Sequence, residues 1–466
     1  MTSMAAAVVL TGELNALESL DEFKTIQVMG PWSKSAVLDV LMWFDTTGAD
    51  HLLLCLSSAP VLEASGLQRL QQCSEDSGAA IVYSDYFDPD KSPHPLIDYQ
   101  TGSLRDDFDF GPVVLLNGKS LAGLADIIEK DTPELKHGGW YDLRLRLVER
   151  GPVERIPEPL YRLPRHDDRP SGQKVFDYVD PRNREVQLEM EQVATAYLKR
   201  IGAYLPPPRD PPVEDDGSYG VKASVIIPVK NRVKTIGDAV ESALGQTAPF
   251  DFNVIVVDNH STDGTTDVLS KIAESDRRLV RLTPERTDLV IGGCWDLAVN
   301  SLACGRYAVQ LDSDDIYSGP EVLKKIIDEF DKNPVALVIG SYSTVDFDLK
   351  PLPPGLIDHR EWTDENGHNN ALRIAGLGAP RAFHVPTLRT VGFPNVSYGE
   401  DYAAVLQLCR SYRVGRIYES LYWCRRWEEN TDAELPLETS NRYNAYKDEL
   451  RTKEIAARKK IVGKQK

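Results

Sequence analysis

Short apolar runs that end in polar residues recur along the second half of the chain. The clearest span residues 223–229, 253–258 and 307–311, which are rich in β-branched residues and short enough for buried parallel strands. Helical patterns separate the runs, as at residues 235–246. This alternation predicts a mononucleotide-binding α/β fold with a mixed, mostly parallel sheet, in which ligands collect beyond the carboxyl ends of the strands.

The first half of the chain repeats this alternation, with strand-like runs at 52–56, 79–83 and 113–116. A helical pattern at 185–201 and a proline-rich stretch at 205–212 follow, and a proline-rich stretch is typical of a stiff linker. We therefore predict two tandem α/β domains and two further parts. The predicted bounds are a first domain at 1–165, a helical and proline-rich linker at 166–221, a second domain at 222–435 and a helical basic tail at 436–466.

Composition narrows the classes of function. The chain has 466 residues, with 53 Lys and Arg against 71 Asp and Glu, and the resulting net charge of −18 argues against a nucleic-acid partner. Its six cysteines lie far apart without metal-ligand spacing, which favours reduced thiols and a cytoplasmic location. No apolar run approaches the length of a membrane span, so we expect no transmembrane segment.

Three carboxylates follow the run at 307–311, at Asp312, Asp314 and Asp315. Like charges at a strand end repel unless a cation lies among them, and hard divalent cations bind carboxylates together with substrate phosphates. Asp312 and Asp314 are therefore candidate ligands of a metal that holds a diphosphate. The alternative is a solvated acidic turn that caps the next helix. Asp258, at the end of another strand, suits hydrogen bonds with a base or ribose, or a structural capping role.

Four motifs occur in order, S-V-I-I-P-V-K-N (224–231), V-V-D-N-H-S-T-D-G-T (256–265), L-D-S-D-D (311–315) and G-E-D-Y (399–402). Together they resemble the family 2 glycosyltransferases of the GT-A fold. The resemblance implies metal-dependent, inverting transfer from a nucleotide-diphosphate sugar, most of all a UDP-sugar, to a hydroxyl of a glycan or lipid-linked glycan, as in polysaccharide biosynthesis. Mn2+ or Mg2+ would be the cofactor.

The resemblance also implies a role for each matching residue. Asp312 and Asp314 would form the D-x-D element that holds the metal, and Asp258 would face the nucleoside. Asp401 would be the general base, with Glu400 beside it, because an attacking hydroxyl must lose a proton. The alternative for Glu400 and Asp401 is a helix N-terminal cap. The donor side of the site would also include three residues of the first motif, Pro228, Val229 and Asn231.

One departure from the family pattern concerns the region before the D-x-D strand, where many members carry an Arg-Asn pair after a glycine. This chain has G-G-C-W-D-L-A at 292–298 instead. Another basic residue is then needed to contact the diphosphate, and our candidates are Arg381, Arg425 and Arg426. The alternative for each is an ordinary surface arginine.

An internal repeat links the two halves. When residues 138–161 are aligned with 399–422, ten of the 24 positions are identical. The catalytic positions differ, because Gly139-Trp140 aligns with Glu400-Asp401. With a nearby shift of the two halves, Ser57 and Ala59 match Asp312 and Asp314. Such residues bind no hard cation and accept no proton, so we expect a catalytically silent first copy. Acceptor binding, homo-oligomer formation and structural support remain open for it.

Two rival functions remain open at this point. A sugar nucleotidyltransferase also combines a mononucleotide fold with metal-binding carboxylates, although its phosphate loop is usually rich in glycine, unlike P-V-K-N-R at 228–232. A non-catalytic protein that binds nucleotide sugars or glycans is the other rival. The basic tail suits either peripheral contact with an anionic inner-membrane surface or a solvated helix end.

Overall fold

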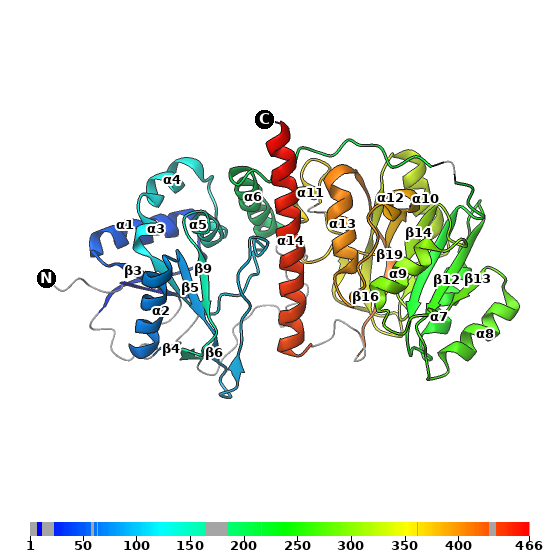
Figure 1. Ribbon diagram of the computed structural model, residues 1–466, viewed down its shortest axis with the longest axis horizontal. Coiled ribbons are helices and arrows are strands. Elements are labelled where there is room, and N and C mark those ends of the chain that lie inside the picture. Colours follow the sequence, from blue (N-terminus) through cyan, green and yellow to red (C-terminus); the bar gives the residue numbers. More distant parts are fainter. Residues whose placement is uncertain are drawn as a thin grey trace. The chain divides into compact units, whose positions relative to one another are not determined.

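The computed structural model describes residues 7–11, 23–56, 60–62, 64–163, 184–215, 217–360, 362–427 and 435–465. The chain forms two compact units. Unit 1 comprises Met1–Asp177, Asn183–Tyr204 and Pro436–Lys466, and unit 2 comprises Tyr178–Arg182 and Leu205–Leu435 (Figure 1). Both units contain mixed α/β structure, as predicted.

Unit 2 is built on one mixed sheet whose strands, among the described residues, follow the order β13-β12-β11-β14-β18-β16-β19-β15, with β17 beside β16. The strands are β11 (Ala223–Val229), β12 (Phe252–Asp258), β13 (Leu279–Leu282), β14 (Tyr307–Gln310), β15 (Ile316–Tyr317), β16 (Leu337–Val345), β17 (Pro351–Ile357), β18 (Arg381–His384) and β19 (Val414–Arg425). The helices are α7 (Ile236–Leu244), α8 (Thr265–Ser275), α9 (Ile291–Asn300), α10 (Val322–Lys332), α11 (Gly367–Asn370), α12 (Val385–Arg389) and α13 (Glu400–Ser411).

The central strands of unit 2 are buried on both faces, which explains their nearly continuous apolar sequences. Strand β11 pairs in parallel with β12 on one side and with β14 on the other, and Val229 lies in register with Asp258. The backbone N–H of Leu311 donates to the carbonyl of Ile226 at 3.2 Å. Parallel pairing therefore brings the polar residues that follow β11, β12 and β14 to one edge of the sheet.

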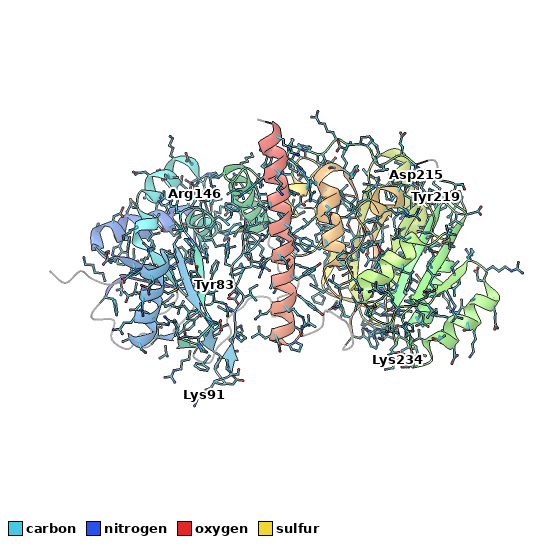
Figure 2. All side chains as sticks on the ribbon, viewed as in Figure 1. Tyr83, Lys91, Arg146, Asp215, Tyr219 and Lys234 are labelled. Carbon is cyan, nitrogen blue, oxygen red and sulfur yellow. The ribbon has the colours of Figure 1, made fainter. Side chains whose placement is uncertain are left out.

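The proline-rich segment expected to be a spacer packs within unit 2. The Leu205 carbonyl accepts from Asn369 at 2.9 Å, and the Val213 N–H donates to the Thr387 hydroxyl at 2.9 Å. Tyr219 donates to Asp215 at 2.6 Å, and the two side chains lie together in Figure 2. Residues 164–183 of the predicted linker lie outside the described residues. The described part of the predicted linker is thus shared between the two units.

Unit 1 has a six-stranded sheet with the order β2-β1-β3-β8-β5-β9, and a smaller sheet with the order β4-β10-β6-β7, among the residues described. The strands are β1 (Ala7–Thr11), β2 (Lys24–Val28), β3 (His51–Cys55), β4 (Val61–Leu62), β5 (Ile81–Ser84), β6 (Tyr86–Phe87), β7 (Pro93–His94), β8 (Val113–Asn117), β9 (Val153–Ile156) and β10 (Tyr161–Arg162). The helices are α1 (Lys34–Thr47), α2 (Ala64–Ser77), α3 (Gly118–Leu121), α4 (Leu124–Asp131), α5 (Gly139–Leu147), α6 (Arg184–Arg200) and α14 (Leu437–Gln465).

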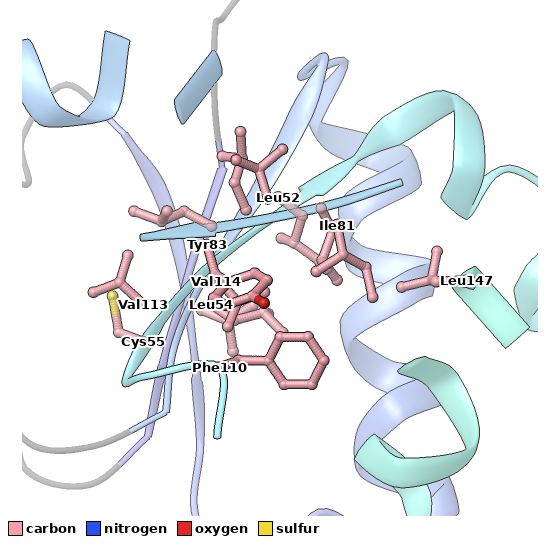
Figure 3. Close-up of a cluster of buried hydrophobic side chains, with 14 of the residues drawn as sticks. Leu52, Leu54, Cys55, Ile81, Tyr83, Phe110, Val113, Val114 and Leu147 are labelled. Atoms are coloured by element: carbon pink, nitrogen blue, oxygen red, sulfur yellow. The ribbon is translucent and has the colours of Figure 1, made fainter. Parts of the chain in front are cut away.

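The core of unit 1 lies between its main sheet and the helices that cover it. Leu52, Leu54 and Ile81 come from neighbouring parts of the sheet and are fully buried, and Leu147 of α5 packs in the same cluster (Figure 3). Phe110 contacts Tyr83 at an edge-to-face ring distance of 5.1 Å. These buried side chains account for the apolar runs of the first half of the chain.

The C-terminal helix α14 belongs to unit 1, whereas the sequence predicted a separate tail. Its Asp448 side chain accepts from Ser103 at 2.9 Å and from Arg105 at 3.2 Å, and Thr452 accepts from the Gly102 N–H at 2.8 Å. Arg451 is buried and donates to Asp448 at 2.7 Å. Within the described part of the chain, no helix combines the length and apolar character needed to cross a bilayer.

Candidate active site

The first group of predicted residues lies just after β14. The backbone N–H of Asp312 donates to the Tyr422 hydroxyl at 3.0 Å, and the Gln310 amide donates to both oxygens of the Asp312 carboxylate at 3.0 and 3.2 Å. Burial raises the pKa of Asp312, and the negative charge of Asp314 adds to the effect. The acidic stretch is therefore folded against β19 and is not a solvated turn.

The end of β19 holds Asp314 through its backbone and Asp315 through its carboxylate. The Arg425 guanidinium donates through Nε to the carbonyl of Asp314 at 2.5 Å, and the Arg425 N–H donates to Asp315 at 2.7 Å. Burial raises the pKa of Asp315 well above its usual value, and Asp314 and Asp312 raise it further. The repulsion between like charges that the sequence predicted is thus present in the fold.

Trp427 is a residue of this cluster that the sequence analysis did not select. Its indole N–H donates to the Asp314 carboxylate at 3.2 Å. Two basic side chains from the loop after β11, Arg232 and Lys234, lie 5.8 and 5.9 Å from the centre of the Trp427 ring. Trp427 therefore connects the loop after β11 with the D-x-D stretch. The sequence signal was the run of aromatic and basic residues that closes β19.

Arg425 has an anchoring role in the structure. Its guanidinium is buried, pairs with Asp238 of α7 at 2.7 Å and stacks 4.7 Å from the ring centre of Phe347. The alternative of an ordinary surface arginine is wrong for this residue, because its side chain is buried and contacts Asp238, Phe347 and the Asp314 carbonyl. Arg426 donates its backbone N–H to Val345 at 2.8 Å. Contact of either arginine with a diphosphate stays a prediction.

Arg381 joins the D-x-D stretch to the predicted base. It begins β18, where its backbone N–H donates to the side chain of Gln310 at 3.2 Å, and Gln310 in turn binds Asp312. Its guanidinium pairs with the Asp401 carboxylate at 2.9 Å. The charge of Arg381 also opposes the rise in the pKa of Asp312, so the three groups lie within electrostatic reach. Arg381 is thus the cation between the two acidic elements.

Glu400 and Asp401 form the first turn of α13, which follows the left-handed Gly399 at φ 81°. A side chain on Gly292 would come within 2.9 Å of the Glu400 Cβ, so this glycine lets α9 approach α13 closely. Neither carboxylate is the N-cap residue. Burial raises the pKa of Glu400 to about 8, the charge of Asp401 adds to this rise, and Arg381 opposes it.

The raised pKa of Glu400 makes stability depend on pH. Because the folded protein holds this proton up to about pH 8 while the unfolded chain releases it near the ordinary value, unfolding becomes easier as pH rises from about 5 to 8. We expect the stability of Glu400→Gln to fall less than that of wild type between pH 5 and 8, by a few kcal/mol at most. Melting temperatures from pH 5 to 8.5 measure it, with Glu274→Gln on the exposed face of α8 as the control. Parallel pH slopes for wild type and Glu400→Gln would contradict the assignment.

The second group of predicted residues lies at the ends of β11 and β12. The Asn231 side chain accepts from the Thr262 N–H at 2.8 Å, and its backbone N–H donates to Ser261 at 2.9 Å. Buried Asp258 accepts from Ser261 at 3.1 Å and from Thr266 at 2.5 Å. These bonds give Asp258 the structural role that was its alternative. Its contact with a nucleoside stays a prediction.

Pro228 and Val229 complete this second group. Pro228 is half-buried, and buried Val229 accepts from the backbone N–H of Asn259 at 2.9 Å. Both residues therefore shape the edge of the sheet through the backbone, and their contact with a donor stays a prediction.

The donor set of this site fits a hard divalent cation only in part. Asp312 and Asp314 supply carboxylate oxygens, which are the ligands that Mg2+ and Mn2+ prefer. Across the described ranges, no group of three or more His, Cys, Asp and Glu side chains is arranged to hold a metal. The protein could therefore contribute two carboxylates, and a bound diphosphate would have to contribute further oxygens.

Parts of the chain are similar in sequence to known proteins. Residues 224–378 match the sequence model of the family described as Glycosyl transferase family 2. The chain is 26% identical over 267 residues to the chondroitin synthase of Pasteurella multocida (strain Pm70), covering 52% of this chain and 26% of that protein. It is 27% identical over 233 residues to the hyaluronan synthase of Pasteurella multocida, covering 45% of this chain and 22% of that protein. The aligned part is thus about a quarter of either relative.

S. aureus TarS 1–349 in complex with UDP aligns with a TM-score of 0.38 at 22% sequence identity, covering 49% of this chain and 69% of that chain.

Proposed function

We propose that unit 2, which contains the residues 224–378 that match the sequence model of Glycosyl transferase family 2, transfers a sugar from a nucleotide-diphosphate donor to a hydroxyl group. We propose a UDP-sugar as donor, inversion at the anomeric carbon and Mn2+ or Mg2+ as cofactor. The acceptor would be a glycan or lipid-linked glycan, which the relatives named as chondroitin and hyaluronan synthases favour.

The observation that carries the proposal is the position of Arg381. It pairs with Asp401 at 2.9 Å and binds through its backbone to the same Gln310 that holds Asp312. A transferase of this kind needs a proton acceptor and a site for the leaving diphosphate close together, because both act on the same anomeric carbon. Arg381 links these two elements within one hydrogen-bonded group.

In the proposed reaction, Asp401 accepts the proton of the acceptor hydroxyl as its oxygen attacks the anomeric carbon. The bond from that carbon to the diphosphate oxygen breaks, and attack from the opposite face inverts the configuration. The ion pair with Arg381 at 2.9 Å holds the Asp401 carboxylate in place before the acceptor binds. Glu400, with its pKa near 8, remains largely protonated at neutral pH and so limits the negative charge beside the base.

Asp312 and Asp314 are the residues that would hold the cation. When bound, Mn2+ or Mg2+ would neutralise the charge that develops on the departing diphosphate. Arg232 and Lys234 lie over the ring of Trp427, which binds Asp314, and we propose that their positive charge also attracts the diphosphate. Trp427 keeps one oxygen of Asp314 occupied and so orients the carboxylate. Buried Arg425 donates to the Asp314 carbonyl and so fixes the backbone at this position.

We further propose that unit 1 is a degenerate copy of the same GT-A fold. Its strands β2-β1-β3-β8-β5-β9 follow the same order as β12-β11-β14-β18-β16-β19 of unit 2. The directions agree at each step, because β8 and β18 run antiparallel to both neighbours while the other pairs are parallel. The small strands agree as well, since β4 pairs with β10 as β15 pairs with β19.

Side-chain contacts at aligned positions support the duplication. The hydroxyl of Tyr141 donates to the Leu104 carbonyl, and the hydroxyl of the aligned Tyr402 donates to Ala371. Tyr141 thus joins α5 to the loop before β8, and Tyr402 joins α13 to the loop before β18. Two unrelated α/β sheets would share strand order more readily than such contacts.

Two further aligned pairs behave in the same way. Arg155 donates to the Asp98 carboxylate at 2.6 Å, as Arg416 donates to the Asp358 carbonyl at 3.1 Å. The aligned glutamates each bind a basic residue of the helix that precedes β5 in unit 1 or β16 in unit 2. These ion pairs are Glu158–Arg69 at 3.0 Å and Glu419–Lys325 at 2.9 Å.

Unit 1 should be silent for this reaction. At the aligned catalytic positions, α5 carries Gly139 and Trp140, neither of which accepts a proton. Ser57 and Ala59, which align with the D-x-D residues, lie outside the described residues. The tail helix α14 is part of unit 1 and two of its arginines are buried, and its contact with an inner-membrane surface stays a prediction.

A thermal-shift screen of the full chain tests the proposed donor. We expect a UDP-sugar to raise the melting temperature more in Mn2+ than in EDTA, because a ligand that binds only the folded state stabilises it by about 2.7 kcal/mol at a hundred times its Kd. GDP-mannose is tested beside the UDP-sugar to compare guanine with uracil as the base. Asp312→Asn should lose the part of the melting-temperature rise that depends on Mn2+. The proposal fails if no nucleotide sugar shifts the melting temperature under either condition.

A further inference from the structure

Two tryptophans meet at the surface of unit 1 where the silent copy would have its active site. The rings of Trp32 and Trp140 lie 6.2 Å apart between centres and are inclined at 48°. Both side chains are partly exposed, and buried Phe110 lies 6.4 Å from Trp140 at a near-perpendicular 72°. Phe110 in turn is anchored in the core shown in Figure 3. The pair is thus partly exposed and rests on the core of unit 1.

The backbone fixes the two tryptophans relative to each other. The N–H of Gly139 donates to the Trp32 carbonyl at 2.8 Å. A side chain at position 139 would come within 2.4 Å of the Ser33 carbonyl, so only glycine permits this approach. Ser33 also caps α1 through its hydroxyl, which accepts from the Ala36 N–H at 3.1 Å. The tryptophans are therefore in place before a ligand arrives, which lowers the entropic cost of binding.

From this geometry we propose that unit 1 binds a glycan chain on the surface formed by Trp32 and Trp140. Pyranose rings present apolar C–H faces and hydroxyl edges, and an indole offers an apolar face together with one N–H donor. Among the described residues, neither indole N–H has a hydrogen-bond partner, so both donors are available for sugar hydroxyls.

The position of Trp140 identifies the ligand class further. In the alignment of the two units, Trp140 takes the place of Asp401, the residue that would meet the acceptor in unit 2. A duplicated unit that kept the acceptor surface and lost the base would hold the glycan without reacting with it. This step rests on the proposed function of unit 2. The ligand of unit 1 is therefore a glycan of the acceptor type, and it is not a nucleotide sugar.

Calorimetric titration of the full chain tests the inference. The probes are octasaccharides of hyaluronan and chondroitin and an uncharged chitin hexasaccharide. We expect at least one probe to bind, and Trp140→Ala and Trp32→Ala each to weaken it roughly three- to tenfold, because an aromatic contact is removed. Trp43→Ala is the matched control, since Trp43 is also a partly buried tryptophan packed against the core of unit 1 but has no place in the pair.

Trp140→Leu keeps apolar bulk and serves as the second variant if Trp140→Ala unfolds. The inference is overturned if no probe binds, if Trp140→Leu binds as tightly as wild type, or if Trp43→Ala loses as much affinity as the other variants. Donor binding is measured in parallel by thermal shift. Glycan binding through Trp140 without any nucleotide-sugar shift would overturn the proposed function and leave this inference standing, and the opposite pattern would overturn only the inference.

Discussion

Asp401→Asn should lower the rate of sugar transfer by about 10²- to 10⁴-fold and leave donor binding nearly intact. Asparagine is close in shape to aspartate and can still accept a hydrogen bond from Arg381, which pairs with Asp401 at 2.9 Å. It cannot take the proton of the acceptor hydroxyl. The loss should therefore appear in turnover. Steady-state transfer from a UDP-sugar, together with its thermal shift, measures the two effects separately.

The control for this substitution is Asp276→Asn. Asp276 is also an arginine-paired carboxylate, bound to Arg278 at 2.6 Å, but it precedes β13 and so lies at the edge of the sheet opposite to the candidate site. It should retain full activity. Normal turnover by Asp401→Asn would show that another group accepts the proton, and Glu400 would then be the next candidate because it shares the same helical turn.

Asp314→Asn should remove the dependence of donor binding on Mn2+, with a loss of at least about 10- to 100-fold in affinity. The asparagine oxygen can still accept from the Trp427 indole, and the backbone carbonyl still accepts from Arg425. The fold around the site should therefore persist while the charge that attracts the cation is gone. Calorimetric titration of UDP with and without Mn2+ measures the effect.

The matched control for Asp314→Asn is Asp331→Asn, because Asp331 pairs with Lys222 at 2.7 Å just before β11, away from the carboxyl ends of the strands. Its Mn2+ dependence should equal that of wild type. If Asp314→Asn binds UDP as well as wild type does in Mn2+, the D-x-D stretch does not hold the metal. The buried acidic stretch would then be a structural element kept in place by Arg425 and Tyr422.

The strands were predictable because their signal is local. A run such as Ala223–Val229 is buried on both faces, and its β-branched residues reflect that burial directly. The carboxylates at strand ends were predictable for the same reason, since Asp258 and Asp312 follow such runs in the sequence. The identities between residues 138–161 and 399–422 also pointed to the shared strand order that the two sheets display.

The partners of the charged residues were not predictable from local patterns. Arg425 was selected as a phosphate contact, yet its guanidinium pairs with Asp238, 187 positions away. The tail helix was predicted to stand alone, yet Asp448 binds Ser103, 345 positions away. The contribution of Trp427 depends on Asp314, which the chain brings close only by folding.

The sequence by itself determined where the strands run, which carboxylates follow them and that residues 138–161 resemble residues 399–422. These features depend on spacing over a few residues and on which positions must be buried. Only the tertiary structure decided that Arg381 stands between Asp401 and the D-x-D stretch, that burial raises the pKa of Glu400, and that Trp140 meets Trp32. Pairing and desolvation depend on which distant segments enclose a group, and folding alone establishes those neighbours.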